Sequence, residues 1–348
     1  MTLRRPPAGK PTPTKVQSAV EVSLFAVFGI SMLVAAIGFV AIYSPSHRIV
    51  PNRVAAGLAA GRVNILVIGM TKVPPPEGNG TEMMTDSVTL LSLKPSTRQL
   101  AMISIPHDLW LRLGRFGMHR LGSAESVGQS SGYPGEGPAL TMDTIQSATG
   151  EPVHAFLRTD EEGLKAAVDA LGGVDVLVQN NFYEWRSHRR FKRGVRRLDG
   201  DHALLFASPY VGGPQGKRFA CEVRQQQLLA AIIDKLRRSK PDVRARVAAA
   251  LPAGGVTDSN LTRGDIDQLC EAASGPTSVR YVTLQPFLDT IQVQSFNESE
   301  GEAVIPHSGD FGPIKALAHG VFGGAGAVAF QPLQPPPPPA VASLASAH

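Results

Sequence analysis

The chain has 348 residues, enough for one large domain or two small ones, and a formal net charge of only +5. Its two cysteines, Cys221 and Cys270, show no CxxC or histidine-rich spacing, which excludes a zinc site defined by sequence. Outside the cytosol they could form a disulfide, or they could remain two buried thiols.

The amino-terminal region has the pattern of a membrane anchor. Four basic residues and no acidic residue lie before Val20, and the uncharged apolar run from Val22 to Tyr43 is long enough to cross a bilayer as a helix. A cleaved signal peptide has a shorter apolar core and a small-residue cleavage site. The flanking positive charge predicts a cytoplasmic amino terminus. We therefore expect a disordered cytoplasmic tail at 1–19, a single transmembrane helix at 20–43, a linker at 44–62, an extracytoplasmic domain at 63–330 and a Pro-rich disordered tail at 331–348.

Three apolar runs open the predicted domain. Val63–Gly69, Ser87–Lys94 and Gln99–Pro106 are rich in Val, Ile and Leu and short enough for buried strands. Turn residues between the second and third predict a hairpin. Asp86 precedes the second run and Asp108 follows the third. Carboxylates at the rim of a buried sheet are typical of functional sites, although Asp also occurs at strand ends simply as a turn former.

The later segments alternate between strand and helix patterns. A helix is expected from Pro138 to Gly150, and a capping-box pattern at Thr159–Glu162 predicts a helix that ends at Leu171. Further helices are expected at 223–238 and from Thr262 to Cys270. Further strands are expected at Val153–Leu157, Val174–Val178 and Arg280–Leu284. The sequence therefore predicts an α/β (α+β) fold, a layered sheet covered by helices on both faces.

Residues 186–197 are strongly basic, with Trp185 beside them. Such a run is typical of a solvated hairpin or loop. A surface for acidic wall polymer or anionic lipid headgroups is the alternative. Nucleic acid is not an expected partner on the outer side of a membrane.

Several motifs together resemble the LytR–CpsA–Psr family of membrane-anchored enzymes. They follow the family's order over about residues 60–290: NILVIG, TDSVTLLSL, SIPHD, ALGGVDVLV, LDGDHALLF and VRQQQLL. Such proteins move a glycan polymer from a polyprenyl-pyrophosphate carrier to the cell wall, with Mg²⁺ and a cluster of arginines. The resemblance thus implies Mg²⁺ as cofactor, and as partners a polyprenyl-pyrophosphate-linked glycan, peptidoglycan or another wall polymer, and the membrane.

The resemblance also implies roles for particular residues. Asp86 and Asp108 would hold or orient the metal, because hard cations prefer oxygen ligands. Arg120 and Arg224 would clamp the pyrophosphate, as guanidinium groups do in forked hydrogen bonds. His107 and Gln225 would add polar contacts to the same ligand.

Other family positions carry different residue types here: Thr71, Met84, Ser208, Tyr210 and Cys221. Two functions therefore stay open, a glycopolymer phosphotransferase and a degenerate member that binds polyprenyl-phosphate lipid or wall polymer as a scaffold. The family has also been labelled as transcriptional attenuators. The expected topology argues against direct DNA binding, because the domain would lie across the membrane from the chromosome.

Overall fold

The computed structural model describes residues 50–73, 82–208, 218–254, 257–274, 278–295 and 298–323. The expected cytoplasmic tail, transmembrane helix and Pro-rich tail lie outside these residues, as does Tyr210. Among the described segments, none forms a helix with the length and apolar character needed to cross a membrane.

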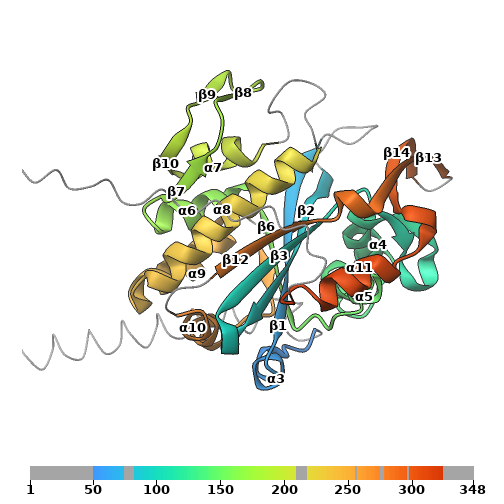
Figure 1. Ribbon diagram of the computed structural model, residues 1–348, viewed down its shortest axis with the longest axis horizontal. Helices are drawn as coiled ribbons and strands as arrows, with labels where there is room; N and C mark the ends of the chain where they lie inside the picture. The colour runs from blue at the N-terminus through green and yellow to red at the C-terminus, as the bar shows by residue number, and fades with distance from the viewer. Residues whose placement is uncertain are drawn as a thin grey trace, which may run out of the picture. The chain divides into compact units, whose positions relative to one another are not determined.

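A six-stranded mixed sheet lies at the centre (Figure 1). Four of its strands are parallel to one another, and β2 and β11 run in the opposite direction. In spatial order the strands are β11 (Asp258–Ser259), β6 (Ala155–Asp160), β1 (Val63–Val73), β2 (Glu82–Lys94), β3 (Gln99–Ile105) and β12 (Ser278–Thr283).

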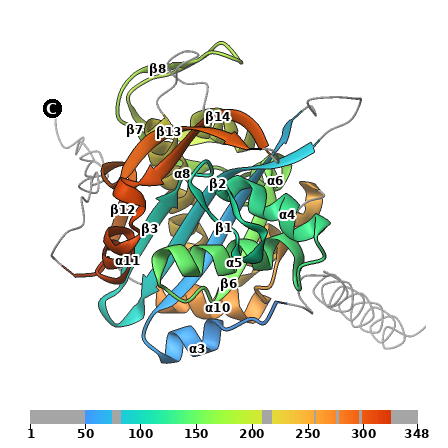
Figure 2. The same ribbon diagram turned by 90° about the vertical axis from the view of Figure 1, so that its right-hand side faces the viewer.

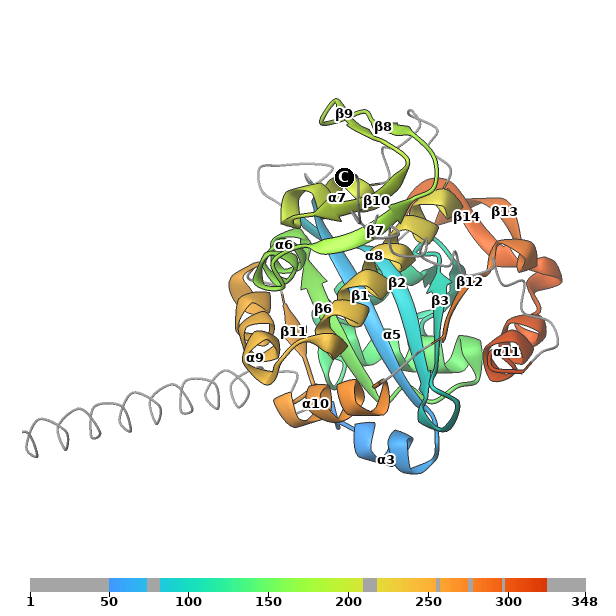
Figure 3. The same ribbon diagram turned by 60° about the vertical axis from the view of Figure 1, so that its left-hand side comes forward.

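Helices cover both faces of this sheet, as expected (Figures 2 and 3). Alternate side chains of β1 point to opposite faces, so Leu66 and Ile68 pack with α5 (Glu136–Thr149) and α11 (Gly312–His319). On the other face, Val63 packs in a cluster with residues of α8 (Arg218–Arg238) and α10 (Arg263–Ala272). The mixed α/β prediction is therefore confirmed.

A third hydrophobic cluster lies beside the sheet, between α8 and a group of shorter elements. It contains Phe206 and Leu228, both buried. Its elements are α6 (Glu161–Ala170), α7 (Gly200–Ala207), α9 (Pro241–Ala250), β7 (Val174–Val178), β9 (Arg189–Phe191) and β10 (Gly194–Leu198). Strand β8 (Phe182–Glu184) pairs with β9 in a projecting hairpin.

The remaining strands and helices lie outside the central sheet. They are two more two-stranded sheets and two helices: β4 (Trp110–Arg112) with β5 (Met118–Arg120), β13 (Leu288–Ser295) with β14 (Glu298–Pro306), α3 (Val54–Ala59) and α4 (Ala124–Ser130). Helix α3 falls within the expected linker, but Val54 is fully buried. The β13–β14 hairpin and α11 were not predicted.

Several local expectations need correction. Asp86 lies inside β2 and not before it, because that strand starts at Glu82. The cap of α6 is Asp160, whose carboxylate accepts the Gly163 N–H (2.9 Å), and not Thr159. The Thr262 capping box is confirmed. Both cysteines are buried free thiols, so no disulfide links them.

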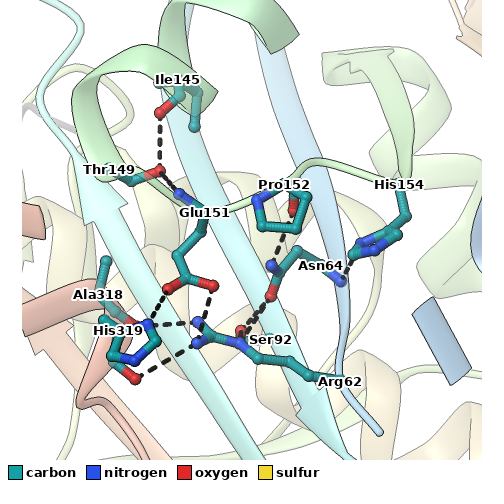
Figure 4. A network of polar contacts seen from close by, with 10 residues as sticks. All are labelled: Arg62, Asn64, Ser92, Ile145, Thr149, Glu151, Pro152, His154, Ala318 and His319. Atoms are coloured by element: carbon teal, nitrogen blue, oxygen red, sulfur yellow. Dashed lines mark hydrogen bonds and ion pairs between the residues drawn. The ribbon is translucent and has the colours of Figure 1, made fainter. Parts of the chain in front are cut away.

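A polar network fastens the start of β1 to the carboxyl-terminal helix (Figure 4). The Arg62 guanidinium pairs with the Glu151 carboxylate (2.9 Å) and donates to the Ala318 carbonyl (2.9 Å). Its Nε donates to Ser92 Oγ (2.8 Å). Glu151 also contacts His319 Nδ1 (3.0 Å). The partly buried arginine therefore has a carboxylate among its acceptors.

Candidate functional site

Most of the predicted site residues gather at one edge of the central sheet. The carboxyl ends of β1, β3, β6 and β12 meet there, because these strands are parallel. Strand β2 runs the other way, so its first half, with Asp86, lies at the same edge. In α/β proteins the carboxyl edge of the strands is the usual place for ligands.

A β-bulge places Asp86. Met70 pairs with Thr85 and Gly69 with Ser87, so Asp86 is the extra residue and has no counterpart on β1. A Cβ on Gly69, opposite the bulge, would lie 2.3 Å from Ser87 Oγ, so a larger residue there would displace the Ser87 hydroxyl. Asp86 Oδ2 accepts a long hydrogen bond from Gln225 Nε2 on α8 (3.5 Å). The structure thus joins two predicted site residues that are 139 positions apart.

A second carboxylate approaches this edge from α6. Glu161 is the first residue of that helix, and its Oε1 accepts from Thr71 Oγ1 on β1 (2.8 Å). Burial, and secondarily the charge of Glu161, raise the pKa of Asp86, while the His107 charge lowers it. The Glu161 carboxylate therefore lies beside Thr71, the residue that we align with a family aspartate.

The SIPHD segment is fixed between two other elements. The His107 carbonyl accepts from Gly122 N (2.6 Å), and the Asp108 carbonyl accepts from Val304 N of β14 (3.1 Å). Asp108 is buried. Arg120 ends β5 and donates through Nη2 to the Glu302 carbonyl (3.4 Å). Asp108 and Arg120 are therefore both tied to β14.

Arg224 is held by backbone carbonyls. Its Nε donates to Phe206 (2.8 Å), Nη1 to Ala220 (3.0 Å) and Nη2 to Ser208 (2.7 Å). The guanidinium carbon lies 5.5 Å from the centroid of the Phe182 ring. Burial lowers the pKa of Arg224. Among the described residues no carboxylate lies within ion-pair distance, so its charge stays unneutralised beside the end of α7.

Helix α8 is oriented by a buried amide. Gln226 Nε2 donates to the Met102 carbonyl of β3 (3.0 Å) and to the Val282 carbonyl of β12 (2.8 Å). One turn earlier, Glu222 accepts from Thr283 Oγ1 (3.3 Å). These contacts fix which face of α8 carries Arg224 and Gln225 toward the sheet edge.

Cys221, which we align with a family arginine, is a buried thiol and supplies no positive charge. Its thiol lies within 3.2 Å of the Ala207 carbonyl. Burial raises the pKa of Cys221 to about 12, with Arg224 acting in the opposite direction. The thiol is thus neutral at physiological pH, and both Arg224 and Asp86 act on it electrostatically.

Sequence reasoning missed Glu161 and Gln226. Glu161 was interpreted only as part of a helix cap, and Gln226 only as part of a helix start. The only sequence signal for Glu161 was Thr71, which we align with a family aspartate. A missing aspartate suggests that another acidic residue takes its place in space. Identifying that residue requires the pairing of β1 with β6, which the local pattern does not give.

The fold and the motifs define one family. The family model of the LytR_cpsA_psr family matches residues 41–300, and the chain belongs to that family. Among its curated relatives, a "Polyisoprenyl-teichoic acid--peptidoglycan teichoic acid transferase TagU" of Oceanobacillus iheyensis is 32% identical over 208 residues. A protein of the same description from Bacillus mycoides is 29% identical over 174 residues.

These alignments cover part of each protein. The first spans 59% of this chain and 59% of the relative, and the second spans 50% and 52%. The chain thus matches about half to three fifths of the length of these curated relatives.

Solved structures share the fold. The crystal structure of TagV from B. subtilis has a TM-score of 0.56 at 22% identity, covering 74% of this chain and 96% of that one. A LytR-CPS2A-psr family protein, YwtF (TagT), with bound octaprenyl pyrophosphate lipid has a TM-score of 0.52 at 18% identity, covering 74% and 89%. Likenesses at this identity establish the architecture.

Proposed function

We propose that this protein is a transferase that moves a glycan polymer from a polyprenyl-pyrophosphate carrier to peptidoglycan or another wall polymer. The observation that carries the proposal is the bulged Asp86 joined to Gln225, with the unneutralised Arg224 one position away on the same helix. A partly buried carboxylate and a cation on the helix that contacts it suit a reaction in which a hydroxyl attacks a phosphate. Membership of the family and the names of the relatives support the same reaction class.

The proposed step exchanges the phosphoanhydride bond of the pyrophosphate for a phosphoester bond to the acceptor. A hydroxyl oxygen of the acceptor polymer forms a bond to the phosphorus that carries the glycan. The bond from that phosphorus to the bridging oxygen breaks, and its electron pair leaves with polyprenyl phosphate. Asp86 takes the hydroxyl proton, a role that suits a carboxylate whose pKa is raised by burial. Arg224 attracts the pyrophosphate by its charge.

Magnesium fits the donor set at this edge. Mg²⁺ is usually bound by one or two carboxylates together with water and substrate phosphates. Asp86 and Glu161 offer two carboxylates, with Asp108 as the further residue implied by the family. No group of three or more His, Cys, Asp or Glu side chains that could hold a metal occurs in the described part of the chain. The ion would therefore arrive with the pyrophosphate, whose negative charge it offsets.

The second candidate function is binding without catalysis. Ser208 Oγ donates to the buried Glu184 carboxylate (3.2 Å), and the Arg224 guanidinium is occupied by carbonyls. A protein of this kind would hold a polyprenyl-phosphate lipid or wall polymer as a scaffold. The occupied guanidinium is the observation that favours it.

We also propose that the protein is located in the cell membrane. The basic tail and the apolar run at 20–43 would anchor the chain in the cell membrane as a single-pass protein. The catalytic domain would then face the wall, where a glycan carrier and its acceptor meet.

The test uses the full chain in detergent micelles with octaprenyl pyrophosphate and Mg²⁺. Water replaces the acceptor hydroxyl, and the release of inorganic phosphate and octaprenyl phosphate is followed. We expect turnover that falls by about 100-fold or more in Asp86→Asn, the range for loss of a proton-transfer group. Glu161→Gln should weaken Mg²⁺-dependent binding, measured by calorimetry. Glu162→Gln is the matched control, since this neighbouring carboxylate is exposed and contacts Lys165 (3.5 Å).

The outcomes separate the two candidates. Turnover by the parent protein that disappears in Asp86→Asn supports the transferase. Tight binding of octaprenyl pyrophosphate without any turnover, also in the presence of peptidoglycan fragments, would leave the scaffold function. Equal effects of Glu161→Gln and Glu162→Gln would remove Glu161 from the site.

A further inference from the structure

The basic run forms an ordered projection. We call residues 182–198, which contain β8, β9 and β10, the basic hairpin (Figures 1 and 3). The rings of Phe182 and Phe191 stack at 4.7 Å, and both pack against Phe206. The buried Glu184 carboxylate accepts the backbone N–H groups of Arg186 (3.2 Å) and Ser187 (2.7 Å). These contacts fix the shape of a segment that would otherwise be a solvated loop.

The surface of this hairpin is strongly positive. All seven of its basic side chains are exposed, and its single acidic residue, Glu184, is fully buried. Arg197 lies 3.8 Å from Asp175. For Arg189, Arg190, Lys192 and Arg193 no carboxylate among the described residues lies within ion-pair distance. These four side chains therefore present concentrated charge that no described carboxylate neutralises by an ion pair.

Apolar groups are exposed among these cations. Trp185 is 53% exposed and Val195 is 47% exposed. They are two of the four large hydrophobic side chains that are exposed in the described residues; the others are Met84 and Met118. Trp185 stands edge-on to Tyr183 at 5.8 Å. Tryptophan and tyrosine beside basic residues are typical of surfaces that meet lipid headgroups, because one end of each ring is apolar and the other polar.

The basic hairpin contacts Arg224 directly and through Ser208. Phe182 lies under the Arg224 guanidinium, and Glu184 accepts from Ser208, whose carbonyl binds Arg224. Figures 1 and 3 show the hairpin projecting beyond the sheet at the end where β1 finishes. A surface that contacts the hairpin therefore has a fixed orientation relative to Arg224.

We propose that the basic hairpin docks on the anionic surface of the lipid bilayer, with its cations among headgroup phosphates and Trp185 at the level of the interface. This rests on the proposed function, since a polyprenyl tail keeps the substrate in the membrane. Docking would hold the sheet edge against the surface from which the pyrophosphate emerges. Solvated charge alone does not explain exposed Trp185 and Val195, whereas a headgroup layer accommodates both kinds of side chain.

The experiment uses Trp185 as its own reporter. The chain has two tryptophans, so Trp110→Phe leaves Trp185 as the single fluorophore. The full chain carrying this substitution is reconstituted in phosphatidylcholine vesicles with or without phosphatidylglycerol. We expect a blue shift and reduced acrylamide quenching only with phosphatidylglycerol, and reversal by salt because headgroup attraction is screened.

A charge variant and a matched control test the surface. Replacing Arg189, Arg190, Lys192 and Arg193 by Ser should lower the docked-to-undocked ratio about fivefold for each cation removed, ~1 kcal/mol each. The control replaces four exposed arginines elsewhere, so the loss of charge is equal: Arg98, Arg238, Arg246 and Arg263. It should leave the Trp185 signal unchanged.

The outcomes decide between distinct partners. A signal that is independent of phosphatidylglycerol, or equal losses in both variants, overturns the proposal. A larger response to soluble poly(glycerol phosphate) than to anionic vesicles would assign the hairpin to acidic polymer and also overturn it. Turnover of octaprenyl pyrophosphate in detergent is read separately, so failure of the proposed transferase function would leave the vesicle result intact.

Discussion

Two arginines at opposite ends of β1 are partly buried in different ways. Arg62 precedes the strand and faces the Glu151 carboxylate at 2.9 Å (Figure 4). Arg224 lies near the far edge of the sheet and donates to three neutral carbonyls. Burial lowers the pKa of both guanidinium groups, but at Arg62 the Glu151 charge works against that effect.

The difference separates a structural cation from a functional one. At Arg62 the charge is cancelled inside the protein, so the pair can only fasten elements together. At Arg224 the donors are used to hold the end of α7, while the net charge remains to attract an anion. Neutral acceptors thus position the guanidinium without neutralising it. Because its N–H groups are already bonded to carbonyls, Arg224 would attract a bound anion mainly by its positive charge and less by new hydrogen bonds.

The largest expected effect is at the Arg62 pair. Glu151→Gln leaves the Arg62 charge without its carboxylate and should lower the free energy of unfolding by about 3 kcal/mol. Urea denaturation measures this change. The affinity for octaprenyl pyrophosphate should stay the same, and a parallel loss of affinity would show that the two ends of the sheet are coupled.

Arg224→Ala should have a smaller effect on stability and a larger one on binding. Loss of the charged donors should cost roughly 1.5–3 kcal/mol of unfolding free energy. Affinity of the folded protein for octaprenyl pyrophosphate, measured by calorimetry, should also fall. Arg224→Lys keeps the charge and should retain more affinity than Arg224→Ala. Unchanged affinity in both variants would show that Arg224 only stabilises the contact between α7 and α8.

Asp86 predicts a pH dependence of definite sign. Burial raises its pKa above the ordinary value of 3.8, so the native state keeps this proton to higher pH than the unfolded chain. The group's favourable contribution is therefore present below pH 3.8 and is lost as pH rises through the native pKa. Asp86→Asn should raise the melting temperature at neutral pH and flatten its dependence on pH. A melting temperature that falls at neutral pH would contradict this assignment.

The smallest effect is expected at an exposed ion pair. Arg246 and Asp242 are 62% and 64% exposed and 3.2 Å apart. Arg246→Ala should change the free energy of unfolding by about 0.2–1 kcal/mol, since solvent and salt screen such pairs. The change in unfolding free energy caused by Arg246→Ala is the reference for the larger change expected from Glu151→Gln. A loss as large as that of Glu151→Gln would mean that burial is not what distinguishes Arg62.

The hairpin of β2 and β3 was readable from sequence, as was the Thr262 cap. Strand character depends on apolar residues within a few positions, and a capping box spans four. Asp86 could be nominated for the same reason, because its motif is contiguous. The boundaries were less accurate: β2 starts at Glu82 because pairing with β1 extends past the apolar run.

By itself the sequence determined the family, the layered sheet and the nomination of Asp86, Gln225 and Arg224. Only the tertiary structure decided that Asp86 is the extra residue of a bulge and that Glu161 lies beside Thr71. It also decided that the acceptors of Arg224 are backbone carbonyls at the end of α7 and in α8. Each of these depends on strand register or on contacts between residues far apart in the chain. Local patterns record burial and turn preference, whereas the partners of a side chain are set by the path of the whole chain.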